Sequence, residues 1–232
     1  MVQKKHEFVF DIGDCIAKYR KYYPCCMVLT SPNNPTGNSL LPTDLQMILE
    51  NVAPSTLVVV DEAYWGFDPW YNQRAFLSLS ESHGNLLFLR SFSKLYALAG
   101  LRIAFGFGAV DAKKWVNYQN RYLGMSRVLE EVAIAALESQ TYYMTLSREI
   151  SRDRERLFAN VNQLNNFHAF ASNANFVFIQ IRNQKQSELL KNAFLKEKIV
   201  IYKFVDDDHI RVSMGTSRYT EEFLKFLRAI DR

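Results

Sequence analysis

Short apolar runs alternate with helical patterns and polar loops through the first half of the chain. Residues 56–64 and 85–94 are rich in β-branched or bulky apolar side chains, which is typical of strands buried on both faces. Residues 25–30 and 102–108 predict two further strands, and residues 42–52 have the spacing of a helix. Buried strands that alternate with helices predict an α/β large domain of three layers with a mostly parallel sheet.

The second half of the chain has a different pattern. Residues 110–165 are mostly helical in spacing, and residues 220–230 predict a closing amphipathic helix. Three strand-like runs lie between these helices, at residues 174–181, 198–204 and 209–216. The pattern predicts a smaller C-terminal α+β domain. We therefore expect a large domain at residues 1–125, followed by a linking helix and the small domain at residues 126–232.

Composition excludes several classes of partner. The chain has 232 residues, 48% of them hydrophobic, which is enough for a sizeable core. Lys and Arg number 28 against 24 Asp and Glu, and no basic stripe stands out, so nucleic acid is not an expected partner. The three cysteines have no metal-ligand spacing and suit a reducing compartment. No apolar run is long enough to cross a bilayer and the N-terminus is charged, so we expect a cytoplasmic protein with no membrane partner.

Polar side chains stand where the predicted strands end. Asn34, Asp61 and Lys94 each follow such a strand, and sites in parallel sheets form just beyond the carboxyl ends of the strands. Lys94 also lies in a largely apolar stretch, and a lysine buried there is costly unless the protein uses it. The alternative is a surface lysine at a strand-to-helix junction, with Arg102 nearby but unrelated.

The polar groups near these positions complement one another chemically. They supply an acid for a ring nitrogen, donors for a phenolic oxygen, hydroxyls and a guanidinium fork for a phosphate, and an amine. The residues concerned are Asn34, Asp61, Tyr64, Ser91, Ser93, Lys94 and Arg102. This inventory matches pyridoxal phosphate.

Four motifs carry a resemblance to a known family. They are SPNNPTG at residues 31–37, VVVDEAY at 58–64, SFSKLYALAGLRIAFG at 91–106 and IRVSMGT at 210–216. Each motif alone is weak, but the four occur in the family's order and the resemblance covers essentially the whole chain. The chain resembles the pyridoxal-phosphate-dependent aminotransferases of fold type I, class I/II, and most of all the histidinol-phosphate aminotransferases.

The resemblance implies a role for each candidate residue. Lys94 matches the lysine that binds the cofactor covalently and then moves a proton as general base and acid. Asp61 matches the aspartate that keeps the ring nitrogen protonated. The other cofactor-binding matches are Tyr64 and Asn34 for the phenolic oxygen, and Ser91, Ser93 and Arg102 for the phosphate. Arg211 matches the arginine that grips the acidic group of the substrate; the alternative is a surface arginine paired with an aspartate at positions 206–208.

The resemblance also implies a reaction and partners. We expect transamination between an amino acid or an amino phosphate, similar to histidinol phosphate, and a 2-oxo acid, carried out by a homodimer. Two alternatives remain open: a phosphoamino-acid decarboxylase on the same fold, and a truncated chain that is not catalytic. Product analysis separates the first, and an absorbance scan with pyridoxal phosphate separates the second.

Two departures from the family pattern bear on these expectations. Tyr202 stands where histidinol-phosphate aminotransferases usually carry an arginine for the acidic end of the substrate, so the amino donor is left open. Family members also have a long segment before the Asn-Pro-Thr-Gly loop, with phosphate ligands and a ring-stacking aromatic residue. We therefore expect the chain to be N-terminally truncated, with an incomplete large domain and weak cofactor binding.

Overall fold

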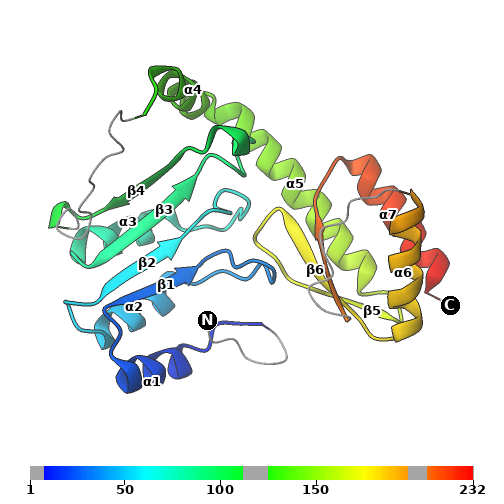
Figure 1. Cartoon of the computed structure of the whole chain (residues 1–232), viewed down its shortest axis with the longest axis horizontal. Coiled ribbons are helices and arrows are strands. Elements are labelled where there is room, and N and C mark those ends of the chain that lie inside the picture. Colours follow the sequence, from blue (N-terminus) through cyan, green and yellow to red (C-terminus); the bar gives the residue numbers. More distant parts are fainter. Residues whose placement is uncertain (1–7, 112–124, 198–207, 232) are drawn as a thin grey trace. The chain divides into compact units, whose positions relative to one another are not determined.

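The computed structural model describes residues 8–111, 125–197 and 208–231. The chain divides into two compact units (Figure 1). The first unit comprises Met1–Pro32, Ser39–Gly66 and Trp70–Thr145, and the second comprises Asn33–Asn38, Phe67–Pro69 and Leu146–Arg232. Two short excursions, at residues 33–38 and 67–69, thus leave the first unit and join the second.

A mostly parallel sheet forms the centre of the first unit, as the sequence predicted. Its strand order is β1-β2-β3-β4, in which β1, β2 and β3 are parallel and β4 is antiparallel to β3. The strands are β1 (Cys26–Thr30), β2 (Leu57–Asp61), β3 (Leu86–Ser91) and β4 (Ala104–Gly108). The α/β class of this unit is confirmed.

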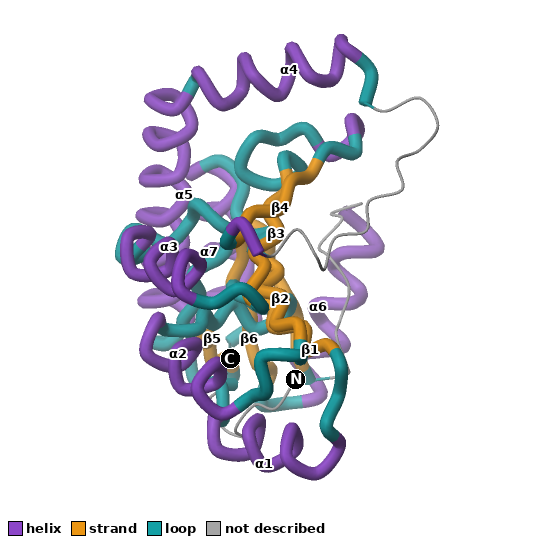
Figure 2. The backbone as a smooth tube through the Cα atoms, turned by 90° about the vertical axis from the view of Figure 1, so that its left-hand side faces the viewer, coloured by secondary structure: helices purple, strands orange, loops and turns teal. Residues whose placement is uncertain are grey.

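Three helices cover one face of this sheet (Figure 2). They are α1 (Ile12–Tyr22), α2 (Pro42–Asn51) and α3 (Gln73–Ser82). Asp11 caps α1 by accepting the Asp14 N–H at 3.0 Å, and Asn72 caps α3 by accepting the Ala75 N–H at 3.1 Å. Buried apolar side chains from these helices meet Val58, Val60, Leu86 and Phe88 of the strands. This core fixes which side of each strand faces away from the helices.

Asp61, the last residue of β2, lies on the other face of the sheet. Thr30, Asp61 and Leu89 are register partners across β1, β2 and β3, so they share one face. Their neighbours Val60 and Phe88 belong to the core, which places Asp61 on the face opposite to the helices. Leu89 on this face is 39% exposed.

The second unit is an antiparallel sheet packed with helices, which confirms the predicted α+β class. Its strands, in the order β5-β6-β7, are β5 (Phe167–Phe170), β6 (Phe176–Ile181) and β7 (His209–Ser213). Its helices are the greater part of α5 (Gln140–Val161), α6 (Gln184–Glu197) and α7 (Ser217–Ile230). Apolar side chains of α5, α6 and α7 meet those of the strands in one core cluster. The strand predicted at residues 198–204 lies outside the described residues, and the strand at Phe167–Phe170 was not predicted.

The last crossing between the two units lies inside α5, between Thr145 and Leu146. Helix α4 (Arg127–Glu138) and the start of α5 belong to the first unit. Contacts with Tyr96 explain this. The Gln140 side-chain amide donates to the Tyr96 hydroxyl at 3.3 Å, and the ring centroids of Tyr143 and Tyr96 lie 4.8 Å apart.

In the described residues, no helix is long and apolar enough to cross a membrane. Within the same ranges, no group of three or more His, Cys, Asp or Glu side chains is arranged to hold a metal ion.

Candidate active site

Asp61 is the last residue of β2 and stands at the carboxyl end of the parallel strands. Its carboxylate Oδ1 accepts the Ala63 N–H at 2.9 Å, and its carbonyl accepts the Ser31 N–H at 2.9 Å. These bonds fix the chain as it turns out of the sheet. A partly buried carboxylate at this place suits a positively charged ring nitrogen.

Lys94 and Tyr64 face one another beside this strand end. Lys94 Nζ lies 5.2 Å from the centroid of the Tyr64 ring. They come from the loops that follow β3 and β2, respectively. Lys94 is exposed, so the cost of burying a lysine does not identify it, contrary to the sequence argument. Its place beside Tyr64, past the end of β3, is what marks it.

The loop between β3 and β4 is held by its own backbone. The Ser91 hydroxyl accepts the Ser93 N–H at 3.0 Å, and the Phe92 N–H donates to the Ile103 carbonyl at 3.1 Å. Ala97 and Arg102 adopt left-handed backbone angles, with φ of 55° and 56°, on either side of a short 3₁₀ turn, η1 (Ala99–Leu101). Non-glycine residues in this region cost energy and concentrate at functional sites.

Arg102 lies at the end of this loop with its side chain exposed. Its Nη1 donates to the Ala99 carbonyl at 3.1 Å, so the guanidinium is drawn back over the turn that precedes it. A guanidinium cannot lose its proton in a protein and remains a charged, forked donor there. Arg102 therefore keeps the chemistry that phosphate binding needs.

Asn34 and Arg211 meet in the second unit although 177 positions separate them in the sequence. Arg211 Nη1 donates to the Asn34 side-chain oxygen at 2.8 Å. Arg211 is 8% exposed on β7, opposite Phe178, and its guanidinium carbon lies 4.9 Å from the centroid of the Phe176 ring. The sequence did not predict this pair. The alternative partners Asp206 and Asp207, and Tyr202, lie outside the described residues.

The loop that carries Asn34 depends on Gly37. Gly37 has a φ of +81°, and a Cβ at this position would lie 2.2 Å from the Ser172 hydroxyl oxygen. Its N–H donates to the Asn33 carbonyl at 2.7 Å, and its carbonyl accepts the Asn173 N–H at 2.7 Å. Only glycine satisfies both the backbone angle and the close approach.

A buried cluster next to Asp61 was missed by the sequence argument. Glu62 is 2% exposed and accepts hydrogen bonds from Arg90 Nε at 2.7 Å and from the Tyr71 hydroxyl at 2.6 Å. The Arg90 guanidinium carbon also lies 3.9 Å from the centroid of the Trp65 ring. Burial raises the pKa of the Glu62 carboxyl, and Arg90 opposes this rise. Two charged residues in adjacent apolar strand patterns were the available signal, because buried charges must pair.

The first unit contains six of the eight candidate residues, and the second contains Asn34 and Arg211. The six are Asp61, Tyr64, Ser91, Ser93, Lys94 and Arg102. Among them, Lys94 Nζ faces the Tyr64 ring. Asp61 and Ser91 are the last residues of β2 and β3, and the other four lie in the loops that follow these strands. The roles of all eight toward a ligand remain predictions.

Comparison with known proteins indicates the same family as the sequence motifs. The family model described as "Aminotransferase class I and II" matches residues 2–227. "Histidinol-phosphate aminotransferase 3" of Mesorhizobium japonicum is 33% identical over 210 residues, which cover 89% of this chain and 55% of that protein. "Histidinol-phosphate aminotransferase 2" of Archaeoglobus fulgidus is 31% identical over 217 residues, which cover 94% of this chain and 60% of that protein. The chain therefore spans little more than half the length of these relatives.

Solved structures show the same fold. The histidinol-phosphate aminotransferase of Sinorhizobium meliloti in complex with pyridoxal-5′-phosphate is similar with a TM-score of 0.81 at 21% identity, over 99% of this chain and 63% of that one. The L-threonine-O-3-phosphate decarboxylase of Porphyromonas gingivalis is similar with a TM-score of 0.72 at 21% identity, over 88% of this chain and 63% of that one. At this identity the likeness extends to the fold alone.

Proposed function

Because the chain belongs to the class I and II aminotransferase family, we propose that the whole protein transfers amino groups between an amino compound and a 2-oxo acid, with pyridoxal 5′-phosphate as cofactor. The observation that carries the proposal is the grouping of Lys94, Tyr64 and Asp61. Lys94 and Tyr64 face one another, and Asp61 ends the neighbouring strand.

The side chains of the first unit fit this cofactor. Asp61 offers a carboxylate to a protonated ring nitrogen, and Tyr64 offers a hydroxyl donor to a phenolic oxygen. Lys94 offers a primary amine beside them, the group that condenses with an aldehyde. Ser91, Ser93 and Arg102 offer hydroxyls and a charged fork to a phosphate. In the second unit, the Asn34 amide is a further donor for the phenolic oxygen.

The residues then divide the work of the reaction. The chemistry that pyridoxal phosphate supplies when bound is that of an electron sink for the substrate Cα. Asp61 keeps its positive partner charged by supplying the opposite charge. Lys94 Nζ takes a proton from one carbon and delivers it to another as general base and acid. Arg211 binds the acidic group of the amino compound and is already held in place by Asn34.

The proposed substrate class is an amino acid or an amino phosphate similar to histidinol phosphate, the compound named in the two relatives. Tyr202 replaces the arginine usual in such enzymes, so the assay needs a panel of amino donors. A decarboxylase is the second candidate, because a phosphothreonine decarboxylase shares the fold. We propose further that the whole protein is a cytoplasmic homodimer. Its cysteines at 15, 25 and 26 are unpaired thiols, consistent with a reducing compartment.

Covalent capture of the cofactor tests the proposal. The protein is incubated with pyridoxal phosphate, reduced with borohydride and mapped by peptide mass spectrometry. The label is expected on Lys94 and is expected to be lost in Lys94→Arg. Lys225→Arg is the matched control, since Lys225 is an exposed lysine on α7. Label on another lysine with none on Lys94 would overturn the assignment.

Product analysis then decides the reaction. Amino transfer to 2-oxoglutarate supports the aminotransferase, whereas carbon dioxide release with no amino transfer supports the decarboxylase. If neither product forms and Lys94 carries no label, the 232 residues by themselves are not catalytic. Sedimentation of the whole protein as a monomer would contradict the homodimer.

A further inference from the structure

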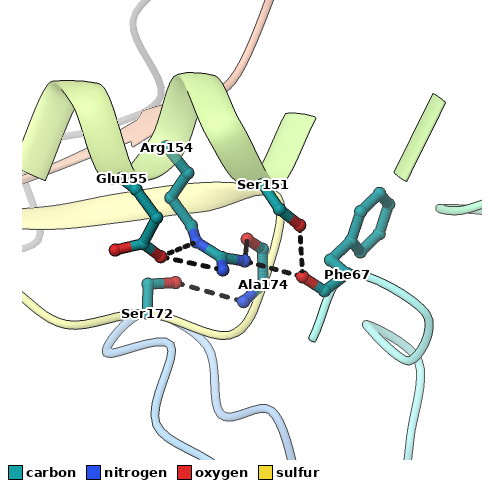
Figure 3. Close-up of polar contacts among 6 residues, drawn as sticks. All are labelled: Phe67, Ser151, Arg154, Glu155, Ser172 and Ala174. Atoms are coloured by element: carbon teal, nitrogen blue, oxygen red, sulfur yellow. Dashed lines mark hydrogen bonds and ion pairs between the residues drawn. The ribbon is translucent and has the colours of Figure 1, made fainter. Parts of the chain in front are cut away.

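Helix α5 contains a buried arginine that the proposed reaction does not use. Arg154 is 2% exposed, yet its only ion pair among the described residues is with Glu155, whose side chain is 63% exposed. A guanidinium keeps its charge when buried, so it needs acceptors for its remaining N–H groups. Those acceptors are two backbone carbonyls, of Phe67 at 2.8 Å and of Ala174 at 3.0 Å (Figure 3).

The two carbonyls belong to segments that are far apart in the sequence. Phe67 begins the short excursion at residues 67–69, and Ala174 lies in the turn that leads into β6. The hydroxyl of Ser151, which is one helical turn before Arg154, donates to the same Phe67 carbonyl at 2.8 Å (Figure 3). Phe67 itself is 1% exposed. Charge-assisted bonds of this kind are among the stronger hydrogen bonds in proteins, so Arg154 fixes both carbonyls on α5.

Phe67 follows Tyr64 by three positions in the chain. Between these residues lies Gly66, which has a φ of +96° and packs so closely that a Cβ would lie 2.6 Å from a methyl carbon of Leu95. Leu95 is the neighbour of Lys94. Gly66 is thus packed against the Lys94 loop within the first unit, and Phe67, the next residue, is held by α5 within the second.

The turn that contains Ala174 contacts the loop that contains Asn34. The Ser172 hydroxyl accepts the Ala174 N–H at 3.2 Å, which closes the turn that Arg154 holds (Figure 3). Ser172 packs on Gly37, and the Asn173 N–H donates to the Gly37 carbonyl at 2.7 Å. Gly37 ends the loop whose Asn34 binds Arg211. The turn at residues 172–174 thus connects the Asn34 loop to Arg154 on α5.

We infer that Arg154 is a positioning residue that fixes two segments of the second unit from one buried guanidinium: residues 67–69, which follow the Tyr64 loop, and the turn at residues 172–174, which supports the Asn34 loop. That the two loops serve a cofactor rests on the proposed function; that Arg154 fixes the two segments rests on the contacts alone. Sequence motifs do not reveal this role, because Arg154 lies in a charged helical stretch that reads as a solvated face. Its burial is visible only in the folded second unit.

Hydrogen exchange on the 232-residue chain without ligand tests the positioning directly. Arg154→Met is expected to speed exchange roughly five- to tenfold in peptides covering residues 33–38 and 64–69, the scale of losing a hydrogen bond or more in each. Peptides of α2 and α7 are the internal controls and are expected to stay unchanged. Glu155→Gln, which removes only the exposed partner, is expected to have little effect. Faster exchange confined to α5 would show a merely structural arginine and overturn the inference.

Two milder variants keep the test decisive if Arg154→Met does not fold. Ser151→Ala removes a donor to Phe67 only, so exchange is expected to rise at residues 64–69 and not at 33–38. Ser172→Ala loosens the other branch, so the opposite pattern is expected. No change in either variant, or equal changes at both loops in both variants, would contradict the two-branch arrangement.

A spectroscopic readout connects the positioning to the cofactor. With pyridoxal phosphate added to the whole protein, Ser151→Ala and Ser172→Ala are expected to shift the pH midpoint of the near-visible absorbance band and to weaken binding, while Glu155→Gln matches the wild type. If hydrogen exchange changes in these variants but the pH midpoint of the band and the affinity for pyridoxal phosphate do not, the link between this positioning and the cofactor is overturned. Absence of the band in the wild type would count against the proposed function, while the exchange patterns still decide the positioning.

Discussion

At the scale of single residues, the adjacent carboxylates of Asp61 and Glu62 have different surroundings. Asp61 ends a strand on the face opposite to the helices and is partly exposed. Glu62 is buried and bound by Arg90 and Tyr71. Because the Glu62 N–H donates to the Leu89 carbonyl at 2.8 Å, the pair also ties the end of β2 to β3. Glu62 thus supports that strand end, while the proposed ligand-binding carboxylate is that of Asp61.

We predict that Glu62→Ala destabilises the first unit far more than Glu62→Gln. Alanine leaves the Arg90 guanidinium buried without its carboxylate, which typically costs about 3–5 kcal/mol. Glutamine keeps the volume and a side-chain oxygen for Arg90, and burial already favours the neutral form of Glu62 by raising its pKa. Denaturant unfolding of both variants measures the difference. Equal losses of unfolding free energy in the two variants would show that the Glu62–Arg90 ion pair does not account for the stability lost in Glu62→Ala.

At the scale of elements, the Asn33–Asn38 loop is shaped by close backbone packing rather than by its own propensity. The Asn33–Asn38 loop lies against the turn that precedes β6. Its internal bonds, Gly37 N–H to Asn33 carbonyl and Asn33 N–H to Asn38 carbonyl, close the loop on itself. The loop sequence predicts a turn, but the contacts of the loop with Ser172 and Asn173 within the second unit are what orient Asn34.

We predict that Gly37→Ala is destabilising whereas Gly100→Ala is nearly neutral. At Gly37 a Cβ would collide with Ser172 and the φ of +81° is unfavourable for alanine, so a loss of roughly 1–3 kcal/mol is expected. At Gly100 no atom lies within 4 Å of the added Cβ. Thermal unfolding of the two variants, compared with the wild type, gives the answer. A neutral Gly37→Ala would mean that the loop is not packed as described.

The pH dependence of stability is predicted from His168 on β5. Burial, followed by the positive charge of Arg182, lowers the pKa of His168. The folded protein therefore binds fewer protons at this residue than the unfolded chain does. Its contribution to stability is present above the unfolded pKa of about 6.5 and is lost as the pH falls through that range.

We expect His168→Gln to reduce the slope of unfolding free energy between about pH 5 and pH 7, because glutamine does not titrate. Chemical denaturation at a series of pH values measures the slope. At about pH 8 both proteins are expected to have flat profiles. An identical slope in the variant would contradict the assignment of this titration to His168.

At the scale of the whole molecule, the candidate residues are divided between two compact units. The first unit contains Asp61, Tyr64, Ser91, Ser93, Lys94 and Arg102, and the second contains Asn34 and Arg211. The chain crosses between the units at residues 33–38 and 67–69 as well as within α5. The chain therefore passes between the two units more than once.

We predict that the 232 residues by themselves bind pyridoxal phosphate weakly. They span 55% of the Mesorhizobium relative, and the family resemblance places further phosphate ligands in the part not spanned. Each missing charge-assisted hydrogen bond costs roughly 1.5–3 kcal/mol, so losing two weakens binding by several orders of magnitude. An absorbance titration measures the affinity, with Lys94→Arg as control. Tight stoichiometric binding with efficient turnover would refute the prediction.

The sequence by itself determined the α/β class of the first sheet and its mostly parallel strands, the position of Asp61 at a strand end, and the family motifs. These features are encoded in short windows of hydrophobic period and local motif, which one sequence displays directly. It did not reveal that Lys94 is exposed, or that the chain passes between the two units more than once, since both depend on how distant segments pack.

Only the tertiary structure decided the pairings that hold the loops. Arg211 meets Asn34 across 177 positions, Arg154 meets Phe67 across 87, and Arg90 meets Glu62 across 28. In each pair, a charged or polar group withdrawn from water takes the acceptor that the fold brings near, and that acceptor has no fixed spacing in the chain. A buried arginine therefore looks like a surface arginine in the sequence until packing shows what surrounds it.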